Sequence, residues 1–165
     1  GHGKDQPGGH AWYEADVVWA PLIGSAVYRR RAFLAKAAIK GNTFRLEMVD
    51  GPDQSALTSV LVKGAGQSGY SLLTDGWGAA GTKLLEGQFI TVGGQGIMLG
   101  ADAVANGSGE ITLSLTSPVR VSPADNAAVE VKRPYSTMKI PATRVGWSVG
   151  PGAIYGASFQ CREAY

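Results

Sequence analysis

The chain has 165 residues, and its 15 lysines and arginines against 13 aspartates and glutamates give a formal net charge of +2. A charge this small provides no strong basic field for wrapping nucleic acid. The 24 glycines lack the every-third-residue period of collagen, and 44% of hydrophobic residues is too many for a disordered chain. This length suits one compact domain or one domain with a small insertion, and the glycines favour short strands joined by turns.

The N-terminal region predicts one strand behind a short polar leader. Residues 1–9 are polar and glycine-rich, and we expect them to be a leader or a cloning remnant outside the fold. Aromatic and β-branched residues alternate with charged ones over 10–19, which indicates a strand that ends before Pro21. The residues on its more apolar face are Tyr13, Ala15, Val17 and Trp19.

Residues 25–40 carry the clearest helical pattern. Ser25 is a suitable cap for the first turn, and Gly41 stands where a left-handed residue ends many helices. Apolar residues recur at intervals of three, four and seven, as on one face of a helix. The members of this stripe are Ala26, Val27, Phe33, Leu34, Ala37 and Ala38.

Short strands account for most of the remaining chain. The sequence 106–109, Asn-Gly-Ser-Gly, predicts a hairpin loop, and Pro134 is expected to stop the strand before it. Since helices and strands do not alternate, a parallel α/β sheet is not expected. The further predicted strands cover 42–50, 57–63, 70–74, 89–92, 97–104, 110–116, 128–132 and 154–164.

These elements predict a mainly β protein. We expect an antiparallel β-sandwich or belt-like core, formed by residues 10–82 and 133–165, with a single α-helix at about 25–40. The strand-dense stretch 83–132 is expected to form a small β-barrel inserted into this core. No apolar run approaches the roughly 20 residues that cross a bilayer, so membrane insertion is not expected.

One glycine-rich stretch matches a nucleotide-binding pattern. Residues 64–69, Gly-Ala-Gly-Gln-Ser-Gly, fit G-x-G-x-x-G after a predicted strand. Dinucleotide binding requires a helix to begin there, so that its N-terminal amides meet the pyrophosphate. The next residues, 70–77, instead predict strand and turn, so we interpret the stretch as a loop and expect no cofactor.

No residue pattern favours catalysis. Cys161 falls on the apolar face of its predicted strand, and the two histidines, His2 and His10, lie near the N-terminus. No nucleophile elbow and no metal-ligand spacing is present in the sequence. A hydrolase with paired carboxylates is the least favoured class. Its candidate residues are Asp50, Asp53, Asp75 and Glu86.

Four residues are candidates for contacts with a partner. Arg29 and Arg30 lie on the predicted helix, either as a solvated face or as an ion-pair contact to a neighbouring subunit. Trp77 and Trp147 lie in glycine-bounded segments, and we expect them to be exposed. Tryptophan faces stack on sugars and peptides, although they more often anchor a core or an interface.

Several stretches resemble tail-tip structural proteins of siphophages, of the distal tail protein type. They include Pro7-Gly8-Gly9-His10-Ala11-Trp12, the helical Arg31-Ala32-Phe33-Leu34 with Gly41-Asn42-Thr43-Phe44, and 69–77. The fourth runs from 85–90 through 105–110 to Pro123-Ala124-Asp125. The resemblance implies a β-rich belt domain with one helix and a second small barrel, hexameric rings at the junction of tail tube and tip, and no catalytic residue or cofactor.

We therefore expect a virion structural protein of a tailed bacteriophage, assembled in the host cytoplasm into the tail. Its partners would be further copies of itself, in a ring held by β-edges and the helix, and other proteins of the tail tube and tail tip. Nucleic acid is not an expected partner. The alternative is a β-sandwich module that binds a carbohydrate or a host receptor, with Trp77 or Trp147 as its platform.

Overall fold

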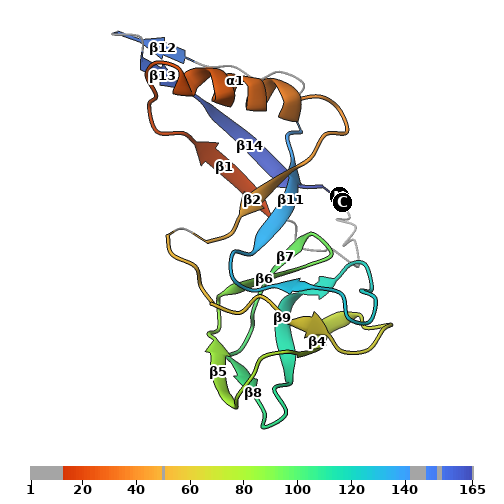
Figure 1. The fold of residues 1–165 in the computed structure, drawn as a ribbon. Helices are drawn as coiled ribbons and strands as arrows, with labels where there is room; N and C mark the ends of the chain where they lie inside the picture. Colours follow the sequence, from red (N-terminus) through yellow and green to blue (C-terminus); the bar gives the residue numbers. More distant parts are fainter. Residues whose placement is uncertain (1–12, 50, 142–147, 152–153, 165) are drawn as a thin grey trace, which may run out of the picture. The chain divides into compact units, whose positions relative to one another are not determined.

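The computed structural model describes residues 13–49, 51–141, 148–151 and 154–164 (Figure 1). Within these residues strands dominate and one α-helix is present, so the prediction of a mainly β fold with a single helix is confirmed. The contacts divide the chain into two compact units. We call residues 47–136 the central unit, and the described parts of 13–46 and 137–164 the terminal unit.

The terminal unit contains a sheet with the strand order β1-β14-β11-β2 (Figure 1). The chain passes between the two units within β2 and within β11. The strands of this sheet are β1 (Glu14–Val18), β2 (Phe44–Glu47), β11 (Tyr135–Lys139) and β14 (Ser158–Glu163). A separate antiparallel hairpin is formed by β12 (Ser148–Gly150) and β13 (Ile154–Gly156).

Alternation along β1 and β14 gives this sheet two unlike faces. The two strands pair antiparallel, and directly opposed residues point to the same face. The inner face, which the helix covers, carries Ala15, Val17, Phe159 and Cys161. The outer face carries Glu14, Asp16, Val18, Gln160 and Arg162, all of which are exposed.

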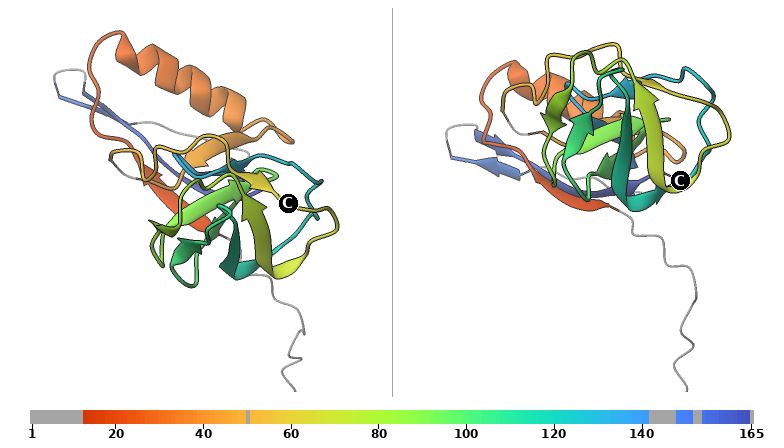
Figure 2. Two further views of the ribbon diagram at one scale, coloured as in Figure 1. Left: turned by 60° about the horizontal axis from the view of Figure 1, so that its bottom comes forward. Right: turned by 90° about the horizontal axis from the view of Figure 1, so that it is seen from below.

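The helix α1 (Ala26–Ala37) crosses the inner face of the sheet (Figures 1 and 2). It is shorter than the predicted 25–40. The side chain of Ser25 makes no capping hydrogen bond. The helix ends before Gly41, with Ala38 as its C-cap residue, and Asn42 Nδ2 donates to the Lys36 carbonyl of the last turn at 2.7 Å. Its fully buried residues, Val27, Leu34 and Ala37, belong to the predicted apolar stripe.

The central unit holds the larger set of strands, which curl around a common core (Figure 2). The hydrogen-bonded orders are β3-β4-β9, β10-β6-β7 and β5-β8. Strand β9 shows the predicted alternation, with Ile111, Leu113 and Leu115 buried and the residues between them exposed. The strands are β3 (Leu61–Val62), β4 (Gly69–Asp75), β5 (Gly81–Leu84), β6 (Phe89–Val92), β7 (Gln95–Met98), β8 (Ala103–Ala105), β9 (Ile111–Val119) and β10 (Val129–Glu130).

The turn after β4 depends on glycine at position 76. Gly76 has φ +83°, a conformation that residues with a side chain rarely adopt. A Cβ atom placed there would also overlap the backbone carbonyl oxygen of Ser59. The chain can therefore approach the segment before β3 closely at this point, which brings Val60 and Trp77 into one core.

The boundaries of the two units differ from the predicted domains. The predicted insertion was 83–132, whereas the central unit begins at Glu47 and ends at Ser136. The reason is a long-range pairing that local patterns do not reveal: β4 pairs with β9, with Leu72 opposite Leu113. Residues 57–75 therefore belong with the later strands.

Several predicted strands also have other bounds. The predicted strand 97–104 is two strands, β7 and β8, and 154–164 is likewise divided between β13 and β14. The turn at 106–109 forms, but β8 pairs with β5 instead of β9. Strand β11 was not predicted, because Pro134 indicates a stop. In the structure the Pro134 carbonyl accepts a hydrogen bond from the Met48 amide at 2.8 Å, and β11 begins at the next residue.

Candidate functional site

An open groove of about 390 Å³ lies on the inner face of the terminal unit, between α1 and the sheet. Four of its nine lining residues are aromatic, and each of these rings is only partly buried. They come from distant parts of the sequence, so the fold has to bring them together. The apolar lining consists of Val17, Trp19, Phe33, Phe44, Leu46 and Phe159.

The period-two alternation of the strands explains how these side chains meet. Val17 lies opposite Phe159 in the β1–β14 pair, and Phe44 and Leu46 alternate with exposed residues along β2. Phe33 reaches the group from α1. Its ring centroid lies 5.3 Å from Phe44 and 6.3 Å from Phe159.

The rings contact one another mostly edge to face or tilted. Trp19 is 5.5 Å from Phe159 at an interplanar angle of 76°, and 5.8 Å from Phe33 at 54°. Such arrangements are the favourable ones for aromatic pairs, so the cluster is ordered by its own contacts. It nevertheless keeps aromatic surface open to solvent, which is typical of an interaction site.

Arginine side chains form the rim of the groove. The guanidinium of Arg30 lies 4.8 Å from the centre of the Trp19 ring, in a cation–π contact. Arg29 lies beside Arg30 and has no ion-pair partner among the described residues. Arg45 of β2 also lines the groove. Arg31 points elsewhere, over the Tyr155 ring at 4.3 Å.

The structure thus brings together Arg29 and Arg30, the two helical candidates, and leaves both exposed. It adds Arg45 and the four aromatic residues, which sequence analysis did not single out as a group. A signal for them exists in the alternation of Phe44 with Leu46 and of Phe159 with Cys161. That alternation identifies a buried face, but it does not reveal that the face stays partly uncovered.

The expectation that Trp77 is exposed is wrong. Its side chain is 0% exposed and belongs to the core of the central unit. The indole Nε1 donates to Thr74 Oγ1 at 2.8 Å, and that hydroxyl donates in turn to the Ile111 carbonyl at 3.0 Å. Glycine neighbours indicated a loop, but the tight turn at Gly76 folds the ring inward. Trp147, the fourth candidate, lies outside the described residues.

The G-x-G-x-x-G stretch is a loop, as predicted. It joins the antiparallel strands β3 and β4, and a strand follows where dinucleotide binding requires a helix. Gln67 fills the loop: its amide donates to the carbonyls of Lys63, Gly64 and Leu73, and its side-chain oxygen accepts from the Leu73 amide at 2.6 Å. The Gly64 amide donates to Asp125 Oδ1 at 2.7 Å, so side chains of the same chain hold this loop.

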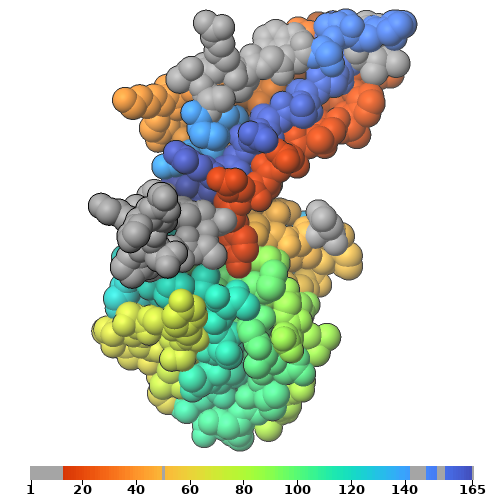
Figure 3. Space-filling view, turned by 180° about the vertical axis from the view of Figure 1, so that it is seen from behind, coloured from red at the N-terminus to blue at the C-terminus, as the bar shows by residue number. Residues whose placement is uncertain are grey.

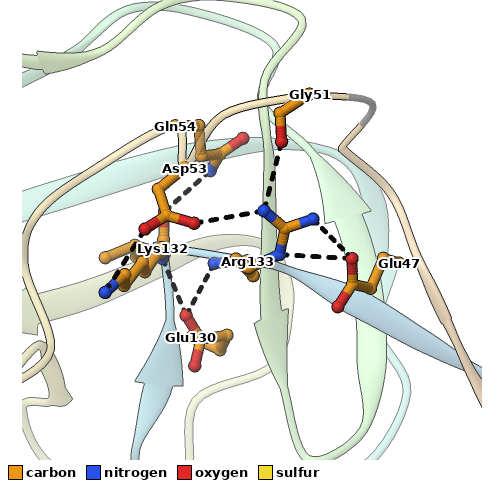
Figure 4. Close-up of polar contacts among 8 residues, drawn as sticks. Glu47, Gly51, Asp53, Gln54, Glu130, Lys132 and Arg133 are labelled. Atoms are coloured by element: carbon orange, nitrogen blue, oxygen red, sulfur yellow. Dashed lines mark hydrogen bonds and ion pairs between the residues drawn. The ribbon is translucent and has the colours of Figure 1, made fainter.

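Asp53, one of the acidic candidates, is engaged with cations together with Glu47. Arg133 donates to Glu47 Oε2 at 2.6 Å, to Asp53 Oδ1 at 3.2 Å and to the Gly51 carbonyl at 3.1 Å (Figure 4). Its hydrogen bonds hold the pKa values of Glu47 and Asp53 below their ordinary range. A general acid needs the opposite shift.

The other acidic candidates do not join this cluster. Asp75 ends β4 opposite Leu61, Glu86 is exposed, and Asp50 lies outside the described residues. Cys161 is buried at 2% exposure, and burial raises the pKa of its thiol, which disfavours the reactive thiolate. It lies on the apolar face that the sequence predicts.

The described residues contain no group of three or more histidine, cysteine, aspartate or glutamate side chains placed to hold a metal ion. The described helix is too short to cross a bilayer.

The groove is therefore the candidate functional site, and its composition of aromatic floor and cationic rim suits a docking surface. Comparisons with known proteins do not assign it: no family model matches the chain, and no curated protein matches it either.

Proposed function

We propose that the protein is a structural component of a bacteriophage tail, at or near the tail tip, and that it assembles into a ring. The observation that carries this proposal is the open groove of the terminal unit. Four aromatic side chains remain partly exposed there beneath three arginines, in a chain whose central unit buries a complete core. Aromatic residues and arginine are enriched at protein interfaces, and a surface of this kind is stabilised when a partner covers it.

The mainly β fold with one helix agrees with what the resemblance to distal tail proteins implies. Strand β1 ends the sheet order, so one of its edges has no neighbouring strand among the described residues. In a monomer the open strand edge and the uncovered aromatic surface are unfavourable, and assembly with other subunits covers both. A ring of like subunits in the virion, in contact with tail tube and tail tip proteins, accounts for both.

The test is the assembly state of the purified protein over a wide range of concentrations. Light scattering with size-exclusion chromatography, together with negative-stain imaging, is expected to show closed rings. The second arm repeats the measurement with the tail tube and tail tip proteins added. A chain that stays monomeric in both arms contradicts the proposal.

A second candidate is a module that binds a carbohydrate or a host receptor. Trp77 is too buried to serve as its platform, but the partly exposed Trp19 in the groove is suited to stacking on a sugar ring. Trp19→Ala is the discriminating variant. Loss of glycan binding in this variant, with an unchanged circular dichroism spectrum, would favour the binding module over the ring. If the wild-type chain binds no glycan, carbohydrate binding is rejected.

A further inference from the structure

We propose that the groove is occupied by the outer face of β1 from a second copy of this chain. This inference rests on the proposed ring and names the two surfaces that meet in it. The groove is surface A, defined by Arg29, Arg30, Arg45 and the aromatic floor. The exposed side chains of β1 are surface B, defined by Glu14, Asp16 and Val18.

Charge is the first reason for this choice of occupant. The rim of surface A has three arginines, and none of the described residues that line it is acidic. Surface B has two carboxylates and lies on the same unit. Complementary charges steer two surfaces together and fix their register, so an arginine rim selects an acidic strand over a neutral one.

The carboxylate at position 16 is the stronger partner for surface A. Glu14 lies opposite Arg162 in the β1–β14 pair, so a cation faces it within its own sheet. Asp16 lies opposite Gln160, which carries no charge. A guanidinium from a second copy would therefore meet no directly opposed cation at Asp16.

Apolar matching is the second reason. Val18 is 76% exposed, although it ends a strand whose other face is packed against the rest of the unit. Residues two apart on a strand are about 7 Å apart and point to one side. Surface B thus presents two carboxylates followed by one valine on one side of the strand. The carboxylates suit the arginine rim of surface A, and the valine suits its aromatic floor.

The two surfaces belong to opposite faces of one sheet. The inner face bears surface A, and the outer face, where β1 and β14 lie side by side at the surface (red and dark blue in Figure 3), bears surface B. Contact between them is therefore heterologous, inner face to outer face. Each copy keeps one surface of each kind open, so such contacts propagate and give a ring where the rotation closes.

Charge reversal with rescue tests the pair of surfaces. Arg29→Glu and Asp16→Arg are each expected to raise the dissociation constant for self-association by about tenfold or more, because like charges then face each other. The double variant is expected to recover most of the wild-type affinity. Analytical ultracentrifugation measures all four proteins. Lys36→Glu, with the same charge change on the same helix, and Glu86→Arg, in the central unit, are the matched controls and are expected to associate as wild type.

Directed cross-linking supplies a measurement that does not depend on affinity. Cys161 is buried, so a cysteine placed on the surface reacts without competition from it. A mixture of Val18→Cys and Arg29→Cys chains is expected to form mixed disulfide dimers on mild oxidation. Each variant alone is expected to give few, since surface A meets surface B and not itself.

The outcomes separate this inference from the proposed ring. Rings that persist in Arg29→Glu and Asp16→Arg contradict the inference and leave the ring in place. Rings lost in Arg29→Glu but kept in Asp16→Arg show that another segment fills the groove, which also overturns the inference. A wild-type chain that never associates, even with its tail partners, contradicts the proposed function itself.

Discussion

The central and terminal units bury their apolar residues to different extents. The core cluster of the central unit contains buried residues from every one of its strands and includes the fully buried Trp77. In the described terminal unit the helix buries Val27, Leu34 and Ala37, yet four aromatic rings stay partly exposed. A unit with a closed core is complete as a monomer, whereas one with an open aromatic groove gains from a partner.

Replacement of Trp77 is expected to cause the largest loss of stability, and the loss should be confined to the central unit. Trp77→Ala removes a fully buried ring and its hydrogen bond to Thr74, which should cost about 3–5 kcal/mol of unfolding free energy. Hydrogen exchange should accelerate over 60–119 while β1 and β14 keep their protection. Trp77→Phe, which retains an aromatic ring, should cost less. Equal acceleration in both units would show that they unfold as one.

A matching change in the terminal unit is Leu34→Ala. Leu34 is 1% exposed, so the expected loss is about 2–4 kcal/mol. The buried Cys161 reports the opening of this unit, because its thiol is 2% exposed and becomes accessible to a thiol reagent when the unit opens. Labelling should accelerate in Leu34→Ala and remain slow in Trp77→Ala. The partly buried Phe33 provides the control, and Phe33→Ala should cost roughly half as much as a fully buried ring.

Glycine at position 76 tests the turn that closes the central core. Gly76→Ala combines a positive φ with overlap of the Ser59 carbonyl, and should cost about 3 kcal/mol. Gly66→Ala is the matched control, since its φ of +78° is similar but nothing lies within 4 Å of the added atom. Strain alone predicts about 1 kcal/mol there. Equal losses in thermal unfolding would contradict the close approach.

The smallest effect is expected at the ion-pair cluster of the central unit. Arg133→Gln should lower the melting temperature only slightly, because the groups are exposed to solvent. Its signature is the pH dependence. Glu47 and Asp53 have lowered pKa values in the folded state, so their contribution is present above their ordinary values of 4.5 and 3.8 and is lost as the pH falls through the lower folded values. The difference between wild type and variant should therefore vanish in acid. A difference that persists at low pH would show that Arg133 acts through its bond to the Gly51 carbonyl.

Much of the fold follows from local sequence patterns. The glycines after Val92 marked the end of β6, whose bounds were predicted correctly. Alternation identified the buried face of β9 and the face of β14 that holds Cys161, because a strand has a period of two wherever one side is covered. The helical stripe identified Val27, Leu34 and Ala37. Strand β5 and the split of 97–104 into β7 and β8 were missed, since their residues lack a pattern that separates short buried strands from turns.

The candidate site was less accessible to prediction. Arg29 and Arg30 were identified from their place on the helix, but their neighbours Phe44, Arg45 and Phe159 join them only through the sheet. Trp77 was misjudged because flanking glycines indicate a turn without saying on which side of it the ring lies. Its burial depends on the Gly76 backbone and on Thr74, whose hydroxyl accepts the indole hydrogen.

Local sequence patterns were enough to predict the mainly β class, the helix and the glycine-rich loop at 64–69, since each is set by residues close together in the chain. The pairing of β4 with β9, the start of the central unit at Glu47 and the burial of particular aromatic rings become evident only in the folded chain. These features depend on contacts between residues far apart in sequence, and no local period encodes which of two apolar faces finds a partner within its own chain. Trp77 and Trp19 are both tryptophans of strand-rich segments, yet one completes a core and the other lines an open groove.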